Sequence, residues 1–238
     1  MGERPFLTAR WHNLVMINYE VDASVLSPFV PSGTTLDLWQ GRAFASVVGF
    51  QFLDTRVLGV PIPFHRDFEE INLRFYVLRD AGGEERRGVV FIREIVPRRA
   101  IAWTARAIYN EPYLALPMRH QIATGTPLNA AFSWRLAGRW HTIGVEAHGP
   151  ASLPAPGSLE EFISEHYWGY TQQRDGSTIE YQVAHPQWPV SAGSARISAD
   201  LEGVYGERLA SHLQEPSSCF IAPGAAITVF RPVRLSGT

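Results

Sequence analysis

The strongest constraint on the fold is an alternating segment at residues 69–80, EEINLRFYVLRD. Apolar and polar residues alternate in this segment, and successive side chains of an extended strand point to opposite faces. The pattern therefore predicts a strand with one apolar and one polar face. The apolar face, typical of a protein core, comprises Ile71, Leu73, Phe75 and Val77. The other face comprises Glu70, Asn72, Arg74 and Tyr76. This second face is consistent with either a solvent-facing strand or the wall of an internal pocket, and the pattern alone leaves both interpretations open.

Further strand and turn patterns follow along the chain. A turn at 81–83 and a return strand, RRGVVFIREIV, complete a hairpin. We also expect strands at 14–21, two strands within 35–54, a hairpin at 128–149 that turns at Ala137–Gly138, and a last strand at 225–235. Helices are expected after Asp22, from Pro97 to about 109, after the capping box of Ser158 and Glu161, and at 204–214. Strands outnumber helices, so the sequence predicts a β-rich α+β fold, an open or closed barrel with packed helices.

Composition limits the classes of function. The 238 residues are 45% hydrophobic, and we expect them to form one domain, 1–238. A net charge of -2 without a basic stripe argues against nucleic acid as a partner. The apolar runs are too short to cross a membrane and the first residues do not resemble a signal peptide, so we expect a cytoplasmic protein. The single cysteine, Cys219, excludes an internal disulfide and favours a small buried residue.

The sequence contains no lysine, and all 21 of its basic residues are arginine. A Schiff base requires an amine that can lose its proton, which a guanidinium group cannot supply. Imine catalysis by a lysine of this chain is therefore excluded.

Two adjacent arginines, Arg98 and Arg99, follow Pro97 where a helix is expected to begin. A helix N-terminus attracts anions, and two guanidinium groups would strengthen that attraction for a carboxylate or phosphate. The pair could instead form structural ion pairs with Glu69, Glu70 or Glu94, or could simply face solvent. The sequence does not decide among these three interpretations.

The segment EHYWGY, residues 165–170, combines an acid, a histidine and three aromatic residues. His166 is a candidate general acid or base, because the ordinary pKa of histidine lies near neutrality. Alternatively, the segment only packs and His166 forms a structural hydrogen bond. A metal site is not indicated, because no metal-binding motif occurs. Glu146 and His148 would share one face of a strand, but two potential ligands alone are a weak signal. No nucleotide-binding motif occurs either, and we expect no cofactor.

The segment from FLTARWHN to FEEINLRFYV and the shorter stretches EIVPR, NEPY, MRH and EHYWGYT form a distinctive set of motifs. Through these motifs the chain resembles the YqjF-like family of bacterial proteins. This family resembles, in turn, a distant branch of the acetoacetate decarboxylase-like superfamily. That resemblance implies a β-barrel or cone-shaped antiparallel sheet around a ligand pocket, with a few packed helices.

The resemblance also implies site residues. Glu70 matches a functional glutamate of the decarboxylases, and Arg98 and Arg99 stand where a lysine pair would lie. Arg10 matches an arginine that helps to bind the substrate carboxylate. We therefore expect Arg98, Arg99, Arg74 and Arg10 to bind a small anion, with Glu70 and His166 as catalytic candidates.

The expected function is a lyase-type or isomerase-type enzyme that acts on a carboxylate-bearing, keto-acid-like ligand by acid–base chemistry. The alternatives are a non-catalytic binding barrel and a structural or interaction protein. Members of such a superfamily often associate, so a homo-oligomer is also expected.

Overall fold

The computed structural model describes residues 5–98, 112–123, 125 and 127–235. Its strands are β1 (Pro5–Val21), β2 (Thr35–Leu36), β3 (Ala43–Val57), β4 (Val60–Pro61), β5 (Phe68–Asp80), β6 (Glu85–Val96), β7 (Tyr113–Ala115), β8 (Met118–Ala123), β9 (Asn129–Leu136), β10 (Arg139–Ala147), β11 (Trp168–Gln172), β12 (Thr178–Ala184), β13 (Ser191–Ser198), β14 (Ser218–Phe230) and β15 (Val233–Leu235). Its helices are α1 (Ala23–Leu26), η1 (Ser27–Phe29), α3 (Leu159–Ser164), α4 (Glu202–Tyr205) and α5 (Glu207–Ala210). No helix within these residues is long and apolar enough to cross a membrane.

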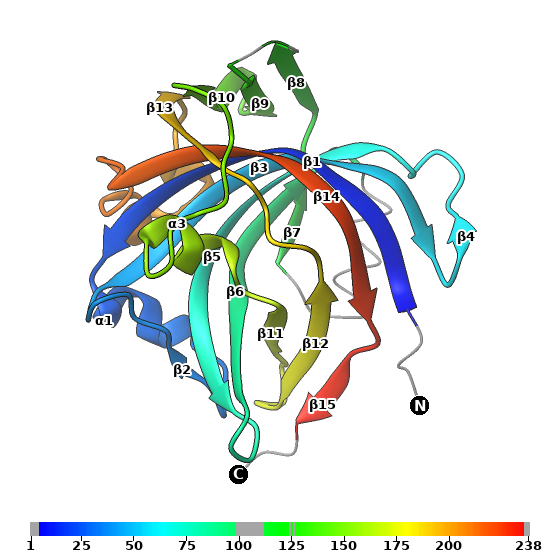
Figure 1. The fold of residues 1–238 in the computed structure, drawn as a ribbon, viewed down its shortest axis with the longest axis vertical. Coiled ribbons are helices and arrows are strands. Elements are labelled where there is room, and N and C mark those ends of the chain that lie inside the picture. The colour runs from blue at the N-terminus through cyan, green and yellow to red at the C-terminus, as the bar shows by residue number, and fades with distance from the viewer. Residues whose placement is uncertain (1–4, 99–111, 124, 126, 236–238) are drawn as a thin grey trace.

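The strands form one strongly curved sheet that partly closes on itself (Figure 1). The neighbours β12, β11, β6, β5, β3, β1 and β14 follow one another, and a short pairing of β12 with β14 joins the two ends. The predicted β-rich α+β fold with a barrel-like sheet is confirmed. The sheet is mixed rather than wholly antiparallel, because β6 pairs in parallel with both β11 and β7.

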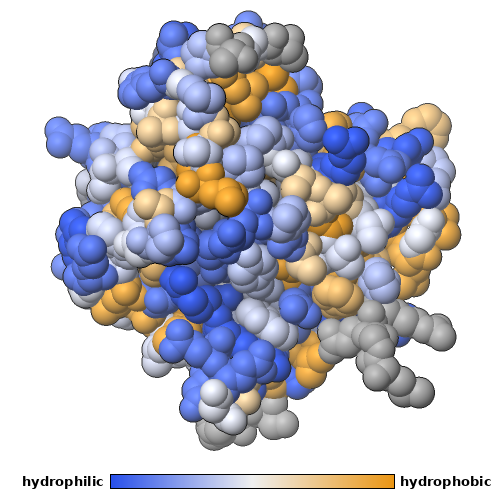
Figure 2. All heavy atoms as spheres, in the orientation of Figure 1, coloured by the Kyte–Doolittle hydropathy of each residue, from blue (hydrophilic) through white to orange (hydrophobic). Residues whose placement is uncertain are grey.

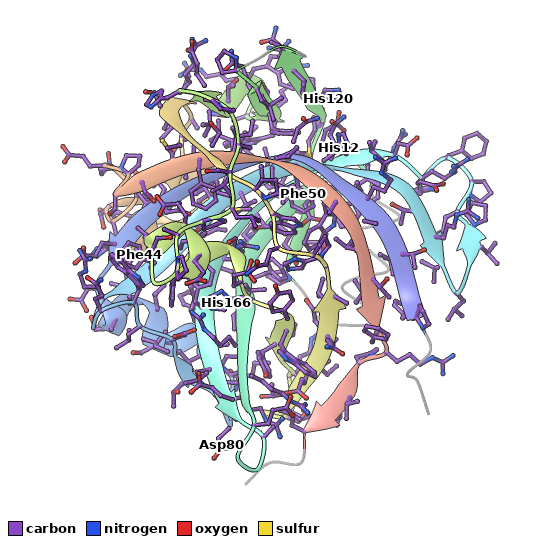
Figure 3. The ribbon with its side chains drawn as sticks, in the orientation of Figure 1. His12, Phe44, Phe50, Asp80, His120 and His166 are labelled. Atoms are coloured by element: carbon purple, nitrogen blue, oxygen red, sulfur yellow. The ribbon has the colours of Figure 1, made fainter. Side chains whose placement is uncertain are left out.

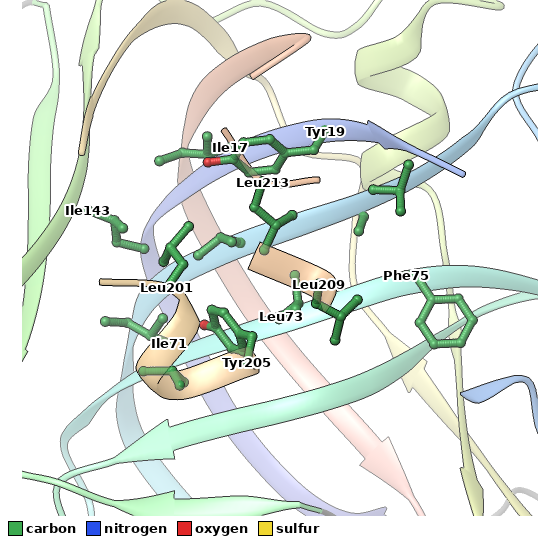
Figure 4. Packing of buried hydrophobic residues seen from close by; sticks show 14 of the residues in the cluster. Ile17, Tyr19, Ile71, Leu73, Phe75, Ile143, Leu201, Tyr205, Leu209 and Leu213 are labelled. Carbon is green, nitrogen blue, oxygen red and sulfur yellow. The ribbon is translucent and has the colours of Figure 1, made fainter. Parts of the chain in front are cut away.

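Both faces of the central strands are buried, each in a different core. One face of β1, β3 and β5 packs against β9, β10 and the short helices α4 and α5. Figure 4 shows Ile71, Leu73 and Phe75 of β5 close to Tyr205 and Leu209 of those helices. The opposite, concave face packs against α3 and the segment around Trp188. The expected core face of β5 is confirmed, and its other face is enclosed as well.

Local sequence signals explain the shortest elements. Asp22 caps α1 by accepting a hydrogen bond from the Ser24 amide, and Ser158 caps α3 by accepting one from the Glu161 amide. The turn between β9 and β10 places Ala137 and Gly138 at positive φ, as the hairpin requires. These caps and turns lie where the sequence predicts them.

One predicted strand pairing differs in the structure, and one predicted helix falls outside the described residues. The sequence predicts two strands within 35–54, on either side of Gln40–Gly41, but β2 pairs with β5 rather than with β3. Only one bridge, between Trp39 and Arg42, closes that turn. The helix expected from Pro97 to about 109 falls largely on residues 99–111, which lie outside the described residues.

Gly224 on β14 allows that strand to lie close against Trp11 on β1. Gly224 has a φ of +91°, and a Cβ atom there would lie 2.0 Å from the Trp11 carbonyl oxygen. Backbone, unlike a flexible side chain, cannot move aside cheaply. Gly224 therefore fixes the approach of β14 to a residue that lines the cavity described below.

We expect Gly224→Ala to lower the free energy of unfolding by about 1–3 kcal/mol more than Gly82→Ala does. Gly82 also has a positive φ, +77°, but open space surrounds its missing Cβ, so it controls for backbone strain alone. Urea unfolding of both variants measures the difference. Equal losses would show that the close contact at Trp11 carries no cost.

Candidate functional site

A cavity of about 400 Å³ lies on the concave face of the sheet. Its walls are largely apolar and aromatic, and a few polar groups are set among them. Among the described residues, the titratable side chains in its lining are His65, Glu70, Arg74, Glu94, His166, Tyr113, Tyr181 and His185. An apolar pocket with a few placed polar groups is the usual form of a small-molecule site.

The cavity extends to the hairpin between β3 and β5, where Ile62 and His65 contribute to its lining. The hairpin carries exposed apolar side chains, among them Leu58, Val60 and Phe64. Figure 2 shows apolar residues gathered at the edge of the molecule near β4, on a face that is otherwise largely hydrophilic. One side of the cavity is therefore bordered by an exposed apolar hairpin.

The polar face of β5 forms one wall of the cavity. Glu70 and Arg74 both line it, and they are only 3% and 7% exposed. The interpretation of this face as solvent-exposed is therefore wrong, and the pocket-wall interpretation holds. A bulge in the pairing of β5 with β6 sets Glu94 opposite Asn72 and Phe91 opposite Arg74. Bulges often redirect side chains beside functional sites, and this one brings Glu94 to the cavity.

Arg74 is a buried cation without a counter-ion among the described residues. Its terminal NH2 group donates to the Ile163 carbonyl oxygen, 3.3 Å away, at the end of α3. The same group lies 3.9 Å from the Met16 sulfur. Its buried Nε has no hydrogen-bond partner in the described part of the chain, and no described carboxylate forms an ion pair with it. Burial of an unpaired charge is costly, so this position favours an anion in the cavity.

Two neutral donors are among the partners of the Glu70 carboxylate. The Asn72 amide donates to Oε1 at 3.0 Å, and the Tyr113 hydroxyl donates to Oε2 at 3.3 Å. Asn72 lies two residues along the same face of β5, whereas Tyr113 comes from β7, which pairs with the far edge of β6. These contacts fix the orientation of the carboxylate at the cavity wall.

His166 follows α3 and is the buried end of a polar chain. Its Nε2 lies 3.0 Å from Oδ2 of Asp37, which also accepts from Nε of Arg87 at 2.8 Å. Since a carboxylate only accepts, the His166 Nε2 donates, and the neutral ring keeps Nδ1 as an acceptor. That buried Nδ1 has no partner within the described residues. In Figure 3 His166 lies on the α3 side of the sheet, and its ring packs on Tyr76 at 4.6 Å.

Burial decides the charge of this pair. It lowers the pKa of His166 to about 4, although the hydrogen bond with Asp37 raises it. For Asp37, burial raises the pKa, but hydrogen bonds from His166 and Arg87 outweigh burial and hold the pKa below its ordinary value. At neutral pH the arrangement is therefore a neutral imidazole on an ionised, arginine-paired carboxylate. Such an imidazole can accept a hydrogen bond or a proton, but it is a weak base.

The structure brings together only part of the predicted site. Glu70, Arg74 and His166 line one cavity. Arg98 and Arg10 are exposed and are not among the residues that line it. Arg99 lies outside the described residues, so its predicted role stays a prediction.

Several residues of the cavity were not singled out by sequence reasoning. Asp37 reaches His166 from 129 positions away, and Trp11 and Trp188 meet in the cavity wall with ring centroids 5.9 Å apart. No local motif connects these residues, and only the closure of the sheet makes them neighbours. Among the described residues no group of three or more His, Cys, Asp or Glu side chains is arranged to hold a metal ion.

Comparison with known proteins supports the relationship that the sequence motifs suggest. The model of the DUF2071 family, described as an uncharacterised conserved protein, matches residues 8–226. The uncharacterised protein YqjF of Bacillus subtilis (strain 168) is 27% identical over 196 residues, which span 80% of this chain and 77% of YqjF.

Solved structures of acetoacetate decarboxylase-like enzymes share the fold. The enduracididine biosynthesis enzyme MppR, complexed with pyruvate, matches with a TM-score of 0.67 and 13% identity, over 100% of this chain and 92% of its own. An acetoacetate decarboxylase-like enzyme from Sphingomonas wittichii RW1 matches with a TM-score of 0.67 and 13% identity, over 98% of this chain and 94% of its own. Acetoacetate decarboxylase from Legionella pneumophila matches with a TM-score of 0.65 and 11% identity, over 96% of this chain and 87% of its own. At such low identity these matches establish the fold alone.

The depressed pKa of His166 predicts how stability depends on pH. Between about pH 6.5 and 4 the unfolded chain binds a proton at His166 that the folded protein does not. The free energy of unfolding should therefore fall as the pH drops through this window, by at most about 1.4 kcal/mol per pH unit from this group. His166→Gln should show a smaller slope in urea unfolding at several pH values. An NMR titration of the wild-type ring with its midpoint near 6.5 would contradict the assignment.

Proposed function

The chain belongs to the DUF2071 family, and we propose that it is a small-molecule enzyme that binds a keto acid and moves a proton on it by acid–base catalysis. The observation that carries the proposal is Arg74, a buried guanidinium without a described carboxylate partner, in the same cavity as Glu70 and His166. The ligand of MppR in the matching structure, pyruvate, is a small keto acid and supports this class of substrate.

Arg74 is assigned the role of carboxylate anchor. A ligand carboxylate beside Arg74 would supply a counter-ion and accept a charge-assisted hydrogen bond from the guanidinium group. Such a bond is stronger than a hydrogen bond between neutral groups. The Ile163 carbonyl accepts a hydrogen bond from one side of the guanidinium group, so the group is oriented before a ligand binds. Preorganisation of this kind reduces the cost of binding.

Glu70 is assigned the role of base. In the proposed step its carboxylate takes a proton from the carbon next to the keto group, and the C–H electron pair forms the C=C bond of an enolate. Return of a proton from Glu70 to the same or another atom completes a tautomerisation. Neutral His166, through Nδ1, would accept a hydrogen bond from a ligand hydroxyl. The step requires no imine, in agreement with the absence of lysine from the sequence.

Pyruvate binding tests the anchor. We expect Arg74→Gln to weaken pyruvate binding by roughly 10- to 100-fold, since hydrogen bonds to charged groups contribute about 1.5–3 kcal/mol. Arg98→Gln removes the same charge from an exposed position and should change the dissociation constant less than about twofold. Isothermal titration calorimetry measures both. A larger loss in Arg98→Gln than in Arg74→Gln would move the anchor to the Pro97–Arg98 turn and contradict this assignment.

Exchange of pyruvate methyl protons with D₂O tests the base. We expect the wild-type protein to accelerate exchange above the buffer rate, as followed by proton NMR. Glu70→Gln should reduce that acceleration by at least about 100-fold, in the range of general-base catalysis, while the pyruvate affinity stays within a few-fold. Glu69→Gln, one position along the strand, serves as the matched control. Binding without exchange in the wild-type protein would identify a binding barrel instead of an enzyme.

A further inference from the structure

The cavity is larger than a three-carbon acid needs. Its volume of about 400 Å³ falls in the range of sites that hold drug-sized molecules, about 300–1,000 Å³. Pyruvate bound at Arg74 would leave most of this space unfilled, and cavity walls without a ligand beside them forfeit dispersion attraction. The lining of the remaining space therefore indicates what the substrate carries beyond its keto-acid group.

The charged side chains of the lining come from one part of the sheet. Among the described residues, its acidic and guanidinium groups are Glu70 and Arg74 on β5 and Glu94 on β6. From β5 the sheet continues through β3, β1 and β14, and β14 pairs with β12 where the sheet closes. These four strands contribute no described acid or arginine to the lining. The two parts of the wall therefore favour different ligand groups.

Aliphatic residues form a row across these four strands. Leu7 of β1 stands opposite Val57 of β3 on one side and opposite Val229 of β14 on the other. Val229 in turn stands opposite Val183 of β12, in the short pairing that closes the sheet. Residues directly opposite one another on paired strands share a face, and all four line the cavity. We call Val57, Leu7, Val229 and Val183 the aliphatic row.

Polar groups on the same strands do not interrupt this apolar wall. The Thr55 hydroxyl on β3 and the Trp11 indole N–H on β1 are buried within the protein. The Tyr181 hydroxyl on β12 lies against Gly169 of β11, where an added Cβ atom would be 2.6 Å from the hydroxyl oxygen. This part of the wall therefore presents hydrocarbon to the cavity, and a polar ligand group beside it would lose its water without gaining a hydrogen bond.

The apolar wall continues to the hairpin between β3 and β5. Val57, at the β3 end of the aliphatic row, stands opposite Val60 of β4. Ile62 follows β4, lines the cavity and is 38% exposed. A ligand chain that extends beyond the row therefore still meets hydrocarbon at the border of the cavity.

We infer that the substrate is a keto acid with an alkyl chain, whose carboxylate binds Arg74 and whose chain lies along the aliphatic row. This inference rests on the proposed function, because it takes Arg74 as the carboxylate anchor, and it adds the substrate class. An alkyl chain can bend along the curved wall of the closing sheet, whereas a rigid planar ring cannot. Each methylene group removed from water by the row adds to the affinity.

Straight-chain keto acids of increasing length test the chain. The series is pyruvate, 2-oxobutanoate, 2-oxohexanoate and 2-oxononanoate, and isothermal titration calorimetry measures their affinities. We expect the affinity of the wild-type protein to rise about three- to fourfold per added methylene up to 2-oxohexanoate, the factor that corresponds to a buried CH₂ group. Phenylpyruvate, which has as many carbon atoms as 2-oxononanoate, should bind less tightly than that acid.

Val57→Thr and Val229→Thr test the aliphatic row. Threonine has a shape similar to that of valine but places a hydroxyl group on the wall, which a bound alkyl chain would leave without a partner. Each substitution should weaken 2-oxohexanoate binding by about three- to tenfold and change pyruvate binding less than about twofold. The matched control is Val60→Thr on β4, a residue that is 64% exposed and does not line the cavity, and it should change neither affinity. Circular dichroism confirms that each variant is folded.

The outcomes separate this inference from the proposed function. If pyruvate binding depends on Arg74 but the longer acids bind no more tightly than pyruvate, the proposed function stands and the alkyl inference is overturned. The inference is also overturned if phenylpyruvate binds more tightly than 2-oxononanoate, or if the row variants lose no more affinity for 2-oxohexanoate than Val60→Thr does. If Arg74→Gln weakens the binding of neither pyruvate nor the longer acids, the proposed function itself fails.

Discussion

The burial of both faces of β5 is the constraint on which the rest of the structure depends. Its apolar face packs against α4 and α5, and its polar face closes the cavity under α3. A strand with one polar face ordinarily leaves that face in water, where charges are hydrated at no cost. Here the curvature of the sheet and the placement of α3 enclose Glu70, Asn72 and Arg74. The polar atoms of these side chains must then find their partners in the surrounding protein or in the cavity.

Among the buried polar groups, those with a full set of partners have a structural role, whereas those without one remain available to a ligand. Glu180, for example, is also buried, but Arg79 and Arg86 pair with it and the Tyr170 hydroxyl donates to it. That cluster is complete and stabilises the joint between β5, β6 and β12. Arg74 has no such carboxylate among the described residues, and the His166 Nδ1 has no donor there. Unlike Glu180, Arg74 and His166 therefore retain hydrogen-bonding capacity that no described residue uses.

The sequence predicted the elements of the fold better than the site. Alternation in 69–80, the capping residues Asp22 and Ser158, and the Ala137–Gly138 turn are local signals, and local signals determined these elements correctly. The parity of β5 also identified Glu70 and Arg74 as a shared face. The alternation along β5 does not show whether its polar face is exposed to solvent or lines a cavity. That depends on α3 and β12, which enclose the face and lie about 90 residues or more further along the chain. The Asp37–His166 contact and the tryptophan pair depend on the same closure.

The charges of the cavity lining also constrain what it can hold. Arg74 contributes one positive charge, His166 is neutral because burial lowers its pKa to about 4, and Glu70 and Glu94 are acids. Arg74 and Glu70 lie four residues apart on one face of β5, so their backbones are roughly 13 Å apart. A ligand with a single carboxylate at the guanidinium group would keep that charge away from Glu70, whereas a second carboxylate beside Glu70 would meet the repulsion of a like charge in a largely apolar cavity. The charges of the lining therefore favour a monocarboxylate with an uncharged remainder, which the aromatic walls also favour.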